Sequence, residues 1–494
     1  MINCSASAKN RSASSENSGS AAALNVTVRI GVFFDGTGNN RVNSQVGADC
    51  QAMSEIYHFS HIKECGGRHS DPNSSYSNDL TNIARLAELY PHQPKASNGG
   101  EGFKVYHSVY VSGVGTTSGG RDSLPGQGFG RGSTGVVAKA SSGIKKINRV
   151  LDQFDVHNPG CVIAALELDI FGFSRGAASA RHMANEVLKQ NRGALGPVLN
   201  HYKLPLAPDF SWSNHSVRLK VIGLFDTVAA VGGVSDFGSV HDAVNRKVNL
   251  FLPPGCAEQV IHLVAGDEHR RNFALNSVTP DWAREIVLPG SHSDIGGGYH
   301  PQSIERVTLT RPRRSRVPAH IPYENTDAWL QTQAEMEELN VHRWLDPQDD
   351  TATVGLECVE RRSQYSFGMK TVLASVRLVR RVFGYLSRVY LRVMHVLACE
   401  EGVPFRPIPD TPDFCLPPEL RGIATKLVNY ARGEGSPLSK EELQILYQRY
   451  IHCSAHWNRP LSTRGVFADS LFVHAPATGG RSRYPNAGQP GYPH

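Results

Sequence analysis

A G-x-S-x-G motif spans residues 172–176, the pattern in which a serine hydroxyl serves as a nucleophile. A largely apolar segment, residues 162–171, precedes it and small residues follow it, which predicts a strand, a sharp turn and a helix. The glycines permit the turn, and the N-terminus of the helix directs backbone N–H groups towards a developing oxyanion. The motif therefore predicts Ser174 as a nucleophile and the N–H group of Arg175 as the first oxyanion donor. The alternative is a structural turn with a capping serine.

A serine hydroxyl becomes reactive when a histidine accepts its proton and a carboxylate orients that histidine. In strand–turn–helix serine hydrolases the order along the chain is serine, acid, histidine. Three histidines follow Ser174 at suitable places, namely His262, His269 and His292. His292 lies in a glycine-rich loop after the last clear strand, residues 285–288, where the base is expected. We therefore predict His292 as the base.

The acid has two candidates at predicted strand ends, Asp226 and Asp267. Asp267 ends the strand directly before the histidine strand, which is the commoner arrangement. Asp294 is two residues from His292 and could instead orient the loop. The spacing alone leaves the choice of acid open.

A second oxyanion donor is expected from a loop after an early strand, and residues 35–38, Asp-Gly-Thr-Gly, fit that place. Glycine lets the backbone approach a substrate closely, so Gly36 and Thr37 are the candidate donors. The alternatives are a plain turn or a phosphate or metal site that begins at Asp35. No cluster of metal-ligand residues is evident, so neither a metal nor another cofactor is predicted.

Apolar strands alternate with helical stretches in the first 300 residues, which predicts a mostly parallel sheet with helices on both faces. The expected strands are 26–34, 104–111, 162–171, 217–225, 259–264 and 285–288, and the expected helices are 78–90, 136–154 and 177–190.

The chain has 494 residues, 40% of them apolar, and a net charge of +6, as in a mildly basic globular protein of two domains or of one large domain with insertions. Nine scattered cysteines without CxxC spacing indicate a reducing cytoplasm and no disulfide framework. We expect neither a signal peptide nor a membrane-spanning helix, so a dedicated machine would have to export the protein.

Composition divides the chain into four parts. We expect a disordered tail at 1–24, a catalytic core at 25–304, a mainly helical and membrane-docking region at 305–474, and a loose tail at 475–494.

Residues 371–398 predict one long amphipathic helix, because apolar residues recur at steps of three and four. The arginines opposite this stripe are Arg377, Arg381, Arg388 and Arg392. Such a helix could lie among phospholipid headgroups. The alternative is a helix packed on the hydrolase core with a solvated basic face.

Five segments together resemble the type VI secretion lipase effectors, in the first family of their G-x-S-x-G group. They are GVFFDGTGNN (31–40), DIFGFSRGAASAR (169–181), VIGLFDTVAAVG (221–232), DEHRRNF (267–273) and LPGSHSDIGGGY (288–299). They span about 270 of the 494 residues in a consistent order.

The resemblance implies an α/β-hydrolase domain with phospholipase A activity on bacterial membranes. Carried over by position, it assigns Ser174 as nucleophile, Asp226 as acid and His292 as base, and leaves Asp267 as the runner-up acid. It also implies an immunity protein and a component or adaptor of the secretion spike as partners, delivery into the periplasm of a target cell, and no nucleic acid. A carboxylesterase for small soluble esters and an inactive membrane-binding module remain as alternatives.

Overall fold

The computed structural model describes residues 23–46, 78–98, 100, 102–116, 135–201, 203–229, 248–339, 341–362, 368–459 and 474–488. Nearly all of the tail expected at 1–24 lies outside these residues. Among the described residues, no helix is long and apolar enough to span a membrane.

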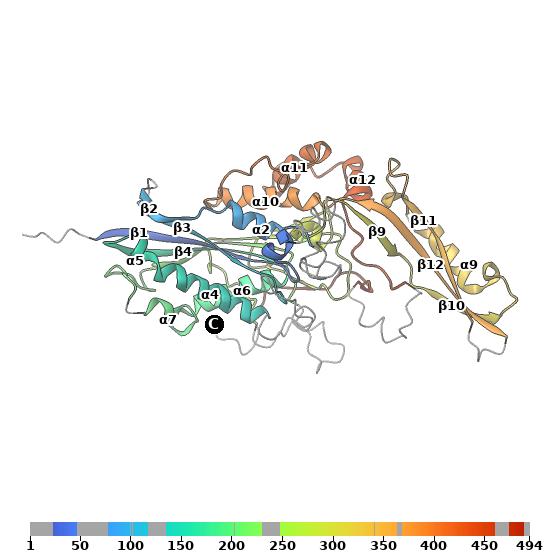
Figure 1. Ribbon diagram of the computed structural model, residues 1–494, viewed down its shortest axis with the longest axis horizontal. Coiled ribbons are helices and arrows are strands. Elements are labelled where there is room, and N and C mark those ends of the chain that lie inside the picture. The colour runs from blue at the N-terminus through green and yellow to red at the C-terminus, as the bar shows by residue number, and fades with distance from the viewer. Residues whose placement is uncertain are drawn as a thin grey trace, which may run out of the picture.

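A seven-stranded sheet forms the centre of the molecule (Figure 1). Its strands follow the order β2-β3-β1-β4-β5-β6-β8, and every neighbouring pair is parallel except β2 with β3. The strands are β1 (Leu24–Phe34), β2 (Gln93–Asn98), β3 (Phe103–Val111), β4 (Cys161–Phe173), β5 (Val217–Phe225), β6 (Gln259–Ala265) and β8 (Glu285–Leu288). The predicted mostly parallel α/β fold is confirmed, because each expected strand forms at or within a few residues of its expected place.

Helices cover both faces of this sheet (Figure 1). One face carries α4 (Val136–Asp152) and α6 (Arg175–Leu188), and the other carries α2 (Asn82–Leu89) and α10 (Leu386–Glu400). Further α-helices are α5 (Phe154–His157), α7 (Gly196–Leu199), α8 (His292–Gly296), α9 (Asp327–Glu338), α11 (Pro418–Ala431) and α12 (Lys440–Arg449). A large apolar core lies on each face of the sheet.

Strand β1 shows why the sheet is buried on both sides. Val28, Ile30 and Val32 point to the α4/α6 core, whereas Phe33 points to the opposite core. The alternation of side chains along a strand produces this division, and the β-branched residues suit a doubly covered parallel strand.

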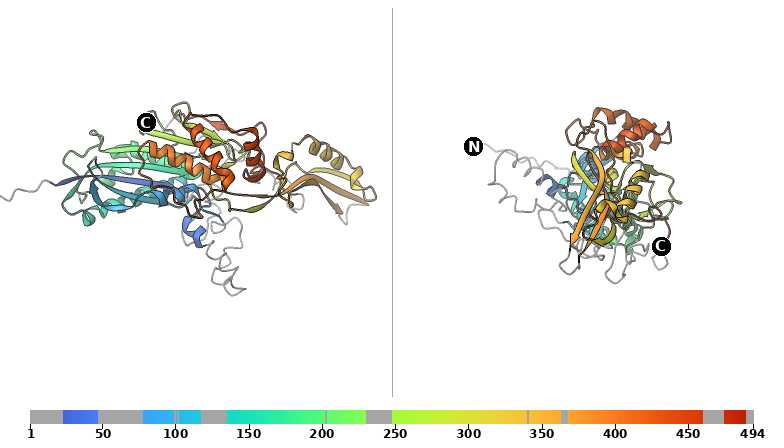
Figure 2. Two further views of the ribbon diagram at one scale, coloured as in Figure 1. Left: turned by 90° about the horizontal axis from the view of Figure 1, so that it is seen from above. Right: turned by 90° about the vertical axis from the view of Figure 1, so that its right-hand side faces the viewer.

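A second, smaller sheet projects from one end of the molecule (Figure 2). It contains β9 (Ser303–Thr308), β10 (Arg313–Pro318), β11 (Thr353–Arg362) and β12 (Met369–Val382), all paired antiparallel, with α9 packed against them. The expectation of a mainly helical region at 305–474 is therefore wrong for its first half. It holds for the second half, which contains α10, α11 and α12.

The single helix expected over 371–398 does not form. Residues up to Val382 belong to β12, and α10 begins only at Leu386. Val372 and Val376 are both buried and lie four residues apart, a spacing that fits a strand as well as a helix. In the second half the helical period holds, but the apolar face of α10 is buried against the sheet and α11.

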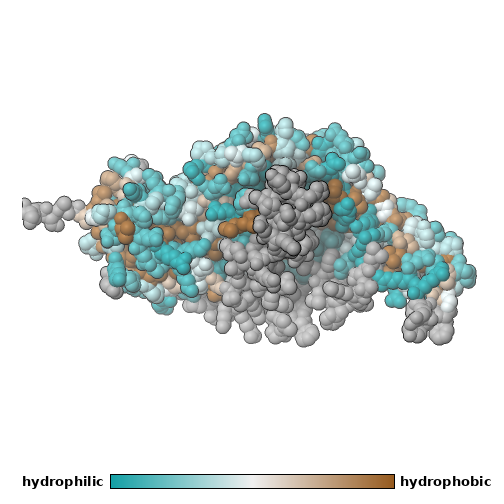
Figure 3. All heavy atoms as spheres, in the orientation of Figure 1, coloured by the Kyte–Doolittle hydropathy of each residue, from teal (hydrophilic) through white to brown (hydrophobic). Residues whose placement is uncertain are grey.

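The four arginines of this segment do not share one helix face. Arg377 and Arg381 lie on β12 near Glu357 and Asp349 respectively. Arg388 is buried, and its guanidinium donates to the Pro412 carbonyl at 2.6 Å. The Arg392 guanidinium donates to the Phe414 carbonyl at 2.8 Å. The helix that was expected to dock on a membrane is thus part of the core, which is the packing alternative named above. On the face shown in Figure 3, hydrophilic residues cover most of the upper region, where α10 and α11 lie.

The C-terminal segment is also ordered where it is described. Strand β13 (Arg483–Tyr484) pairs in parallel with β7 (Leu275–Asn276), and Asn486 is buried. The loose tail expected at 475–494 is therefore wrong for residues up to 488, and its remainder lies outside the described residues.

Candidate active site

Ser174 occupies a strained turn between β4 and α6. Its backbone has φ 58° and ψ −126°, a region that residues with a side chain rarely adopt. The two flanking positions must be glycine because there is no room for a Cβ atom. A Cβ on Gly172 would lie 2.6 Å from the Cα of Ala177, and one on Gly176 would lie 2.3 Å from the carbonyl oxygen of Asp35. The turn thus has the geometry of a nucleophile elbow.

The turn is fixed to the next strand of the sheet. The Ser174 N–H group donates to the Phe225 carbonyl at 3.0 Å, and Phe173 is the register partner of Phe225. Asp226 follows directly and also has a positive φ, 41°. Parallel register therefore brings Ser174 and Asp226 to the same edge of the sheet.

His292 reaches this edge from the first position of α8, just after β8. Its Nδ1 lies 2.5 Å from Oδ2 of Asp226, and both side chains are buried. The imidazole ring packs against Phe173, the residue before Ser174, with 4.7 Å between ring centroids. The structure thus brings together the three residues that the resemblance assigned.

The Asp226 carboxylate has further partners. Its Oδ1 accepts from the Ala265 N–H group at 3.0 Å, and the Arg481 guanidinium donates to both carboxylate oxygens at 2.8 Å. Arg481 was missed in the sequence because its segment was expected to be loose. A lone arginine in a Gly/Pro-rich stretch gives no signal of a partner 255 positions away.

Burial and neighbouring charge shift the pKa of the Asp226 carboxyl group in opposite directions. Burial favours the neutral acid, but the charge of Arg481 and the hydrogen bond from His292 hold the pKa of Asp226 well below its usual range. Burial lowers the pKa of His292, although Asp226 opposes that shift. At neutral pH the acid is therefore ionised and the imidazole is neutral, which are the states that a general base requires.

A buried glutamate supports the backbone of the same loop. Glu268 accepts from the His292 N–H group at 3.2 Å and pairs with Arg270 at 2.8 Å. Burial raises the pKa of Glu268, but the charge of Arg270 outweighs this effect and lowers the pKa to about 2.

The loop after β1 lies against the N-terminus of α6, as the closeness of Gly176 to Asp35 shows. The Asp35 carboxyl group accepts hydrogen bonds from the N–H group of Gly36 at 2.7 Å, from Thr81 at 2.6 Å and from Tyr110 at 2.5 Å. Burial raises the pKa of Asp35. These three donors organise the turn around the carboxyl group.

The candidate oxyanion donors differ in their surroundings. The Gly36 N–H group is aimed at Asp35, so the expectation that it faces the substrate is wrong. The Thr37 hydroxyl is buried and has no hydrogen-bond partner among the described residues. Arg175 begins α6 directly after Ser174, and burial lowers the pKa of its side chain to about 10.

The other acids and histidines that the sequence offered have structural contacts. Asp267 accepts from the Gly290 N–H group and from the Tyr447 hydroxyl, both at 2.7 Å, and thereby holds the loop before His292. His262 is buried with Nδ1 3.0 Å from Glu285, and His269 is exposed.

Asp294 is paired with another histidine. Its Oδ1 lies 2.7 Å from Nδ1 of His452, and its Oδ2 accepts from the N–H and hydroxyl groups of Ser291. Asp294 therefore caps α8 and orients the loop, the role that the sequence left open for it.

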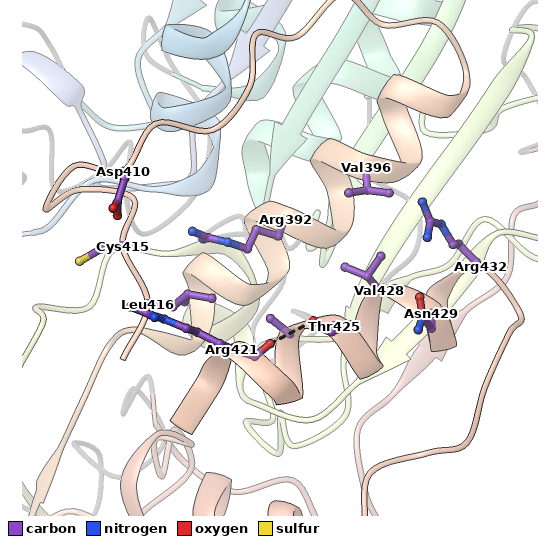
Figure 4. A pocket seen from close by; sticks show the side chains of 11 residues that line it. Arg392, Val396, Asp410, Cys415, Leu416, Arg421, Thr425, Val428, Asn429 and Arg432 are labelled. Atoms are coloured by element: carbon purple, nitrogen blue, oxygen red, sulfur yellow. Dashed lines mark hydrogen bonds between the residues drawn. The ribbon is translucent and has the colours of Figure 1, made fainter. Parts of the chain in front are cut away.

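A cavity of about 510 Å³ lies between α10 and α11 (Figure 4). Its walls include Val396, Leu416 and Val428 together with Arg392 and Arg421, and none of the residues at the carboxyl edge lines it. Within the described part of the chain, no group of three or more His, Cys, Asp or Glu side chains could hold a metal ion.

Comparison with known proteins identifies a family for this arrangement. The family model for the catalytic domain of Tle1-like type VI secretion phospholipase effectors matches residues 207–316, which include Asp226 and His292. No curated protein matches the chain. A solved structure of the Tle1 effector bound to the VgrG spike of the type VI secretion system is 29% identical, with a TM-score of 0.70 over 96% of this chain and 98% of that chain.

A second solved structure, of an uncharacterized protein from Pseudomonas aeruginosa, is 18% identical over 85% of this chain and 52% of that chain, and its TM-score of 0.34 carries no argument. The match of the family model and the similarity to the Tle1 structure over nearly its whole length agree with the segments quoted above. The chain resembles the Tle1-like phospholipase effectors of the type VI secretion system, in the catalytic-domain match and in the fold of nearly its whole length.

Proposed function

We propose that this chain is a serine phospholipase A that hydrolyses a fatty-acyl ester of bacterial membrane phospholipids. The observation that carries the proposal is the 2.5 Å contact between His292 Nδ1 and Asp226, beside the strained turn at Ser174. The strained backbone places the buried Ser174 side chain at the edge of the sheet, and the Asp226–His292 pair supplies an oriented base.

In this reaction Ser174 Oγ attacks the ester carbonyl carbon while His292 takes the hydroxyl proton. The imidazolium then returns the proton to the leaving alkoxide, which departs as the hydroxyl group of a lysophospholipid. Water attacks the acyl-enzyme with His292 again as base, and the fatty acid and free Ser174 result. Asp226 remains ionised throughout and stabilises the imidazolium.

Two donors are proposed for the negative oxygen that forms in each step. The first is the Arg175 N–H group, because it follows the nucleophile at the start of α6. The second is Thr37, because its buried hydroxyl lacks a partner and its loop lies against α6. A buried donor without a partner costs free energy in the resting protein, and an oxyanion would relieve that cost.

The biological setting follows from the family and stays part of the proposal. We propose that the enzyme is made in the cytoplasm, binds a component of the secretion spike and is delivered to the periplasm of a rival cell. The related effector in the solved structure is bound to VgrG. A cognate immunity protein would protect the producing cell.

The test is fatty-acid release from phosphatidylethanolamine/phosphatidylglycerol vesicles by the intact protein and by Ser174→Ala. We expect release by the intact protein and a loss on the order of 10⁴-fold or more in the variant. Release of fatty acid from only one position of mixed-chain lipids would define the A1 or A2 type. Cleavage of a short soluble ester but not of vesicles would favour the carboxylesterase alternative, and failure on both substrates would reject the triad.

A further inference from the structure

The Arg481 side chain is bound at three points at the carboxyl edge of the sheet. Its two terminal nitrogens donate to the two oxygens of Asp226 at 2.8 Å each, and its Nε donates to the Phe273 carbonyl at 2.6 Å. The side chain is 9% exposed. A planar guanidinium fits this two-point contact with a carboxylate, which the point charge of a lysine does not reproduce.

The main chain around Arg481 is held in place independently of this contact. Leu275 N–H donates to the Ser482 carbonyl at 2.9 Å, and Ser277 N–H donates to the Tyr484 carbonyl at 2.9 Å. Further along, the Asn486 side chain accepts from Arg181 at 3.0 Å. The segment is therefore a fixed support for the guanidinium.

Arg481 also contacts Phe273, an aromatic neighbour of His292. It binds the carbonyl of Phe273, and the Phe273 ring packs edge-on against the His292 ring with 4.9 Å between centroids. One side chain thus fixes both the acid and an aromatic neighbour of the histidine.

We infer that Arg481 is a positioning residue of the hydrolase, which fixes the rotation of the Asp226 carboxylate so that one oxygen faces His292. This inference rests on the proposed function, since it assigns Arg481 a role in the Ser174, Asp226 and His292 triad. The catalytic unit accordingly includes the last part of the chain, far from the core expected at 25–304.

Arg481 acts on Asp226 through both its geometry and its charge. A carboxylate held only by Ala265 and His292 has freedom to rotate, and misplacement of a catalytic group by about 1 Å costs roughly 100-fold in rate. The positive charge of Arg481 offsets the buried negative charge, so Asp226 stays ionised without a strong rise in the proton affinity of His292. Loss of Arg481 should therefore raise the pKa of both members of the pair.

The experiment compares Arg481→Ala and Arg481→Lys with Arg483→Gln in vesicle hydrolysis across pH. Arg483 is a matched control two residues away, because it also pairs with a carboxylate, Glu285 at 3.2 Å, but it is 53% exposed and does not contact the triad. We expect R481A to lower kcat about 100-fold with little change in KM, R481K to fall between, and R483Q to stay near the intact protein.

Two further readouts separate positioning from a merely structural role. In R481A the acid limb of the pH profile should move to higher pH, because proton affinity rises when the positive charge is removed. Guanidinium chloride, at concentrations far below those that unfold proteins, should restore part of the R481A activity, whereas sodium chloride at equal ionic strength should not.

The inference is overturned if R481A behaves like R483Q, or if a folded R481A loses activity equally at every pH without recovery by guanidinium. If R481A does not fold, R481K decides, and full activity with an unshifted profile in R481K would also overturn it. Activity that survives Ser174→Ala would instead reject the proposed function, so the two failures are distinguishable.

Discussion

Two buried aspartate–histidine pairs meet at α8, yet their surroundings differ. His292 pairs with Asp226 at 2.5 Å, and Asp294 pairs with His452 at 2.7 Å. The first pair lies beside the strained turn of Ser174. In the second pair Asp294 caps α8, and His452 is stacked on Tyr299 with 3.7 Å between ring centroids.

Both pairs have a short contact between a carboxylate and an imidazole, so this contact alone does not distinguish a catalytic base from a structural histidine. Asp226 has a guanidinium that keeps it ionised and a nucleophile turn one strand away. Asp294 is occupied by main-chain N–H groups that hold a loop. We therefore propose a catalytic role for the first pair and a structural role for the second.

Removal of the charge on the first pair should have the largest effect. Asp226→Asn should lower kcat by about 10⁴-fold, because the amide cannot hold the imidazole in the required tautomer. The measurement is steady-state hydrolysis of vesicles, with circular dichroism as a check of folding. A loss of less than tenfold in a folded variant would place the triad acid elsewhere.

Removal of the unpaired Thr37 hydroxyl, in the loop that lies against α6, should have the next largest effect. Thr37→Val keeps the shape of the side chain and should cost about 100-fold in kcat, the typical value for one oxyanion donor. Thr37→Ser retains a hydroxyl and should recover most of that loss. Equal rates for the valine and serine variants would show that the side chain is not the donor.

The pH profile tests the state of the first pair. His292 must be neutral to accept the serine proton, and its pKa is lowered from 6.5 by burial. Activity should thus persist below pH 6.5 and then fall about tenfold per pH unit as the imidazole is protonated. A profile of kcat/KM whose acid limb lies above pH 6.5 would contradict this electrostatic account.

A change to the second pair should affect stability more than rate. His452→Gln should alter kcat by less than about threefold but reduce the free energy of unfolding by roughly 1–3 kcal/mol, because a buried hydrogen bond to Asp294 is disturbed. Denaturant unfolding and vesicle hydrolysis measure the two effects. A rate loss as large as that of Asp226→Asn would erase the distinction between the pairs.

The smallest effect is expected away from both pairs, on β12. Arg377→Gln and Arg381→Gln remove charges near Glu357 and Asp349 at 3.9 and 4.0 Å. Each should change the free energy of unfolding by at most about 1 kcal/mol and leave hydrolysis of a soluble ester unchanged. A large loss of that hydrolysis would connect the small sheet to the chemistry.

The central sheet and the turn at Ser174 could be predicted from the sequence because each is marked by a local pattern of residues. Apolar runs mark the strands, and the glycines beside Ser174 mark a turn without room for side chains. Spacing alone left the choice between Asp226 and Asp267 open, since both residues end strands. The resemblance favoured Asp226, and the structure places its carboxylate 2.5 Å from His292.

Two features could not be predicted because their signals are not local. Val372 and Val376 fit the period of a strand and of a helix alike, so the end of β12 depends on pairing with β9, β10 and β11. Arg481 reaches Asp226 only because β13 pairs with β7 far back in the chain. Contacts of this kind depend on tertiary structure and leave no pattern in the local sequence.

The most direct test of the central claim is the rate at which a fluorophosphonate labels Ser174, measured by mass spectrometry of the intact protein, Asp226→Asn and His452→Gln. We expect labelling at Ser174 alone, strongly slowed in D226N and nearly unchanged in H452Q. Labelling at another residue, or an equal rate in D226N and the intact protein, would contradict the claim that the Asp226–His292 pair activates Ser174.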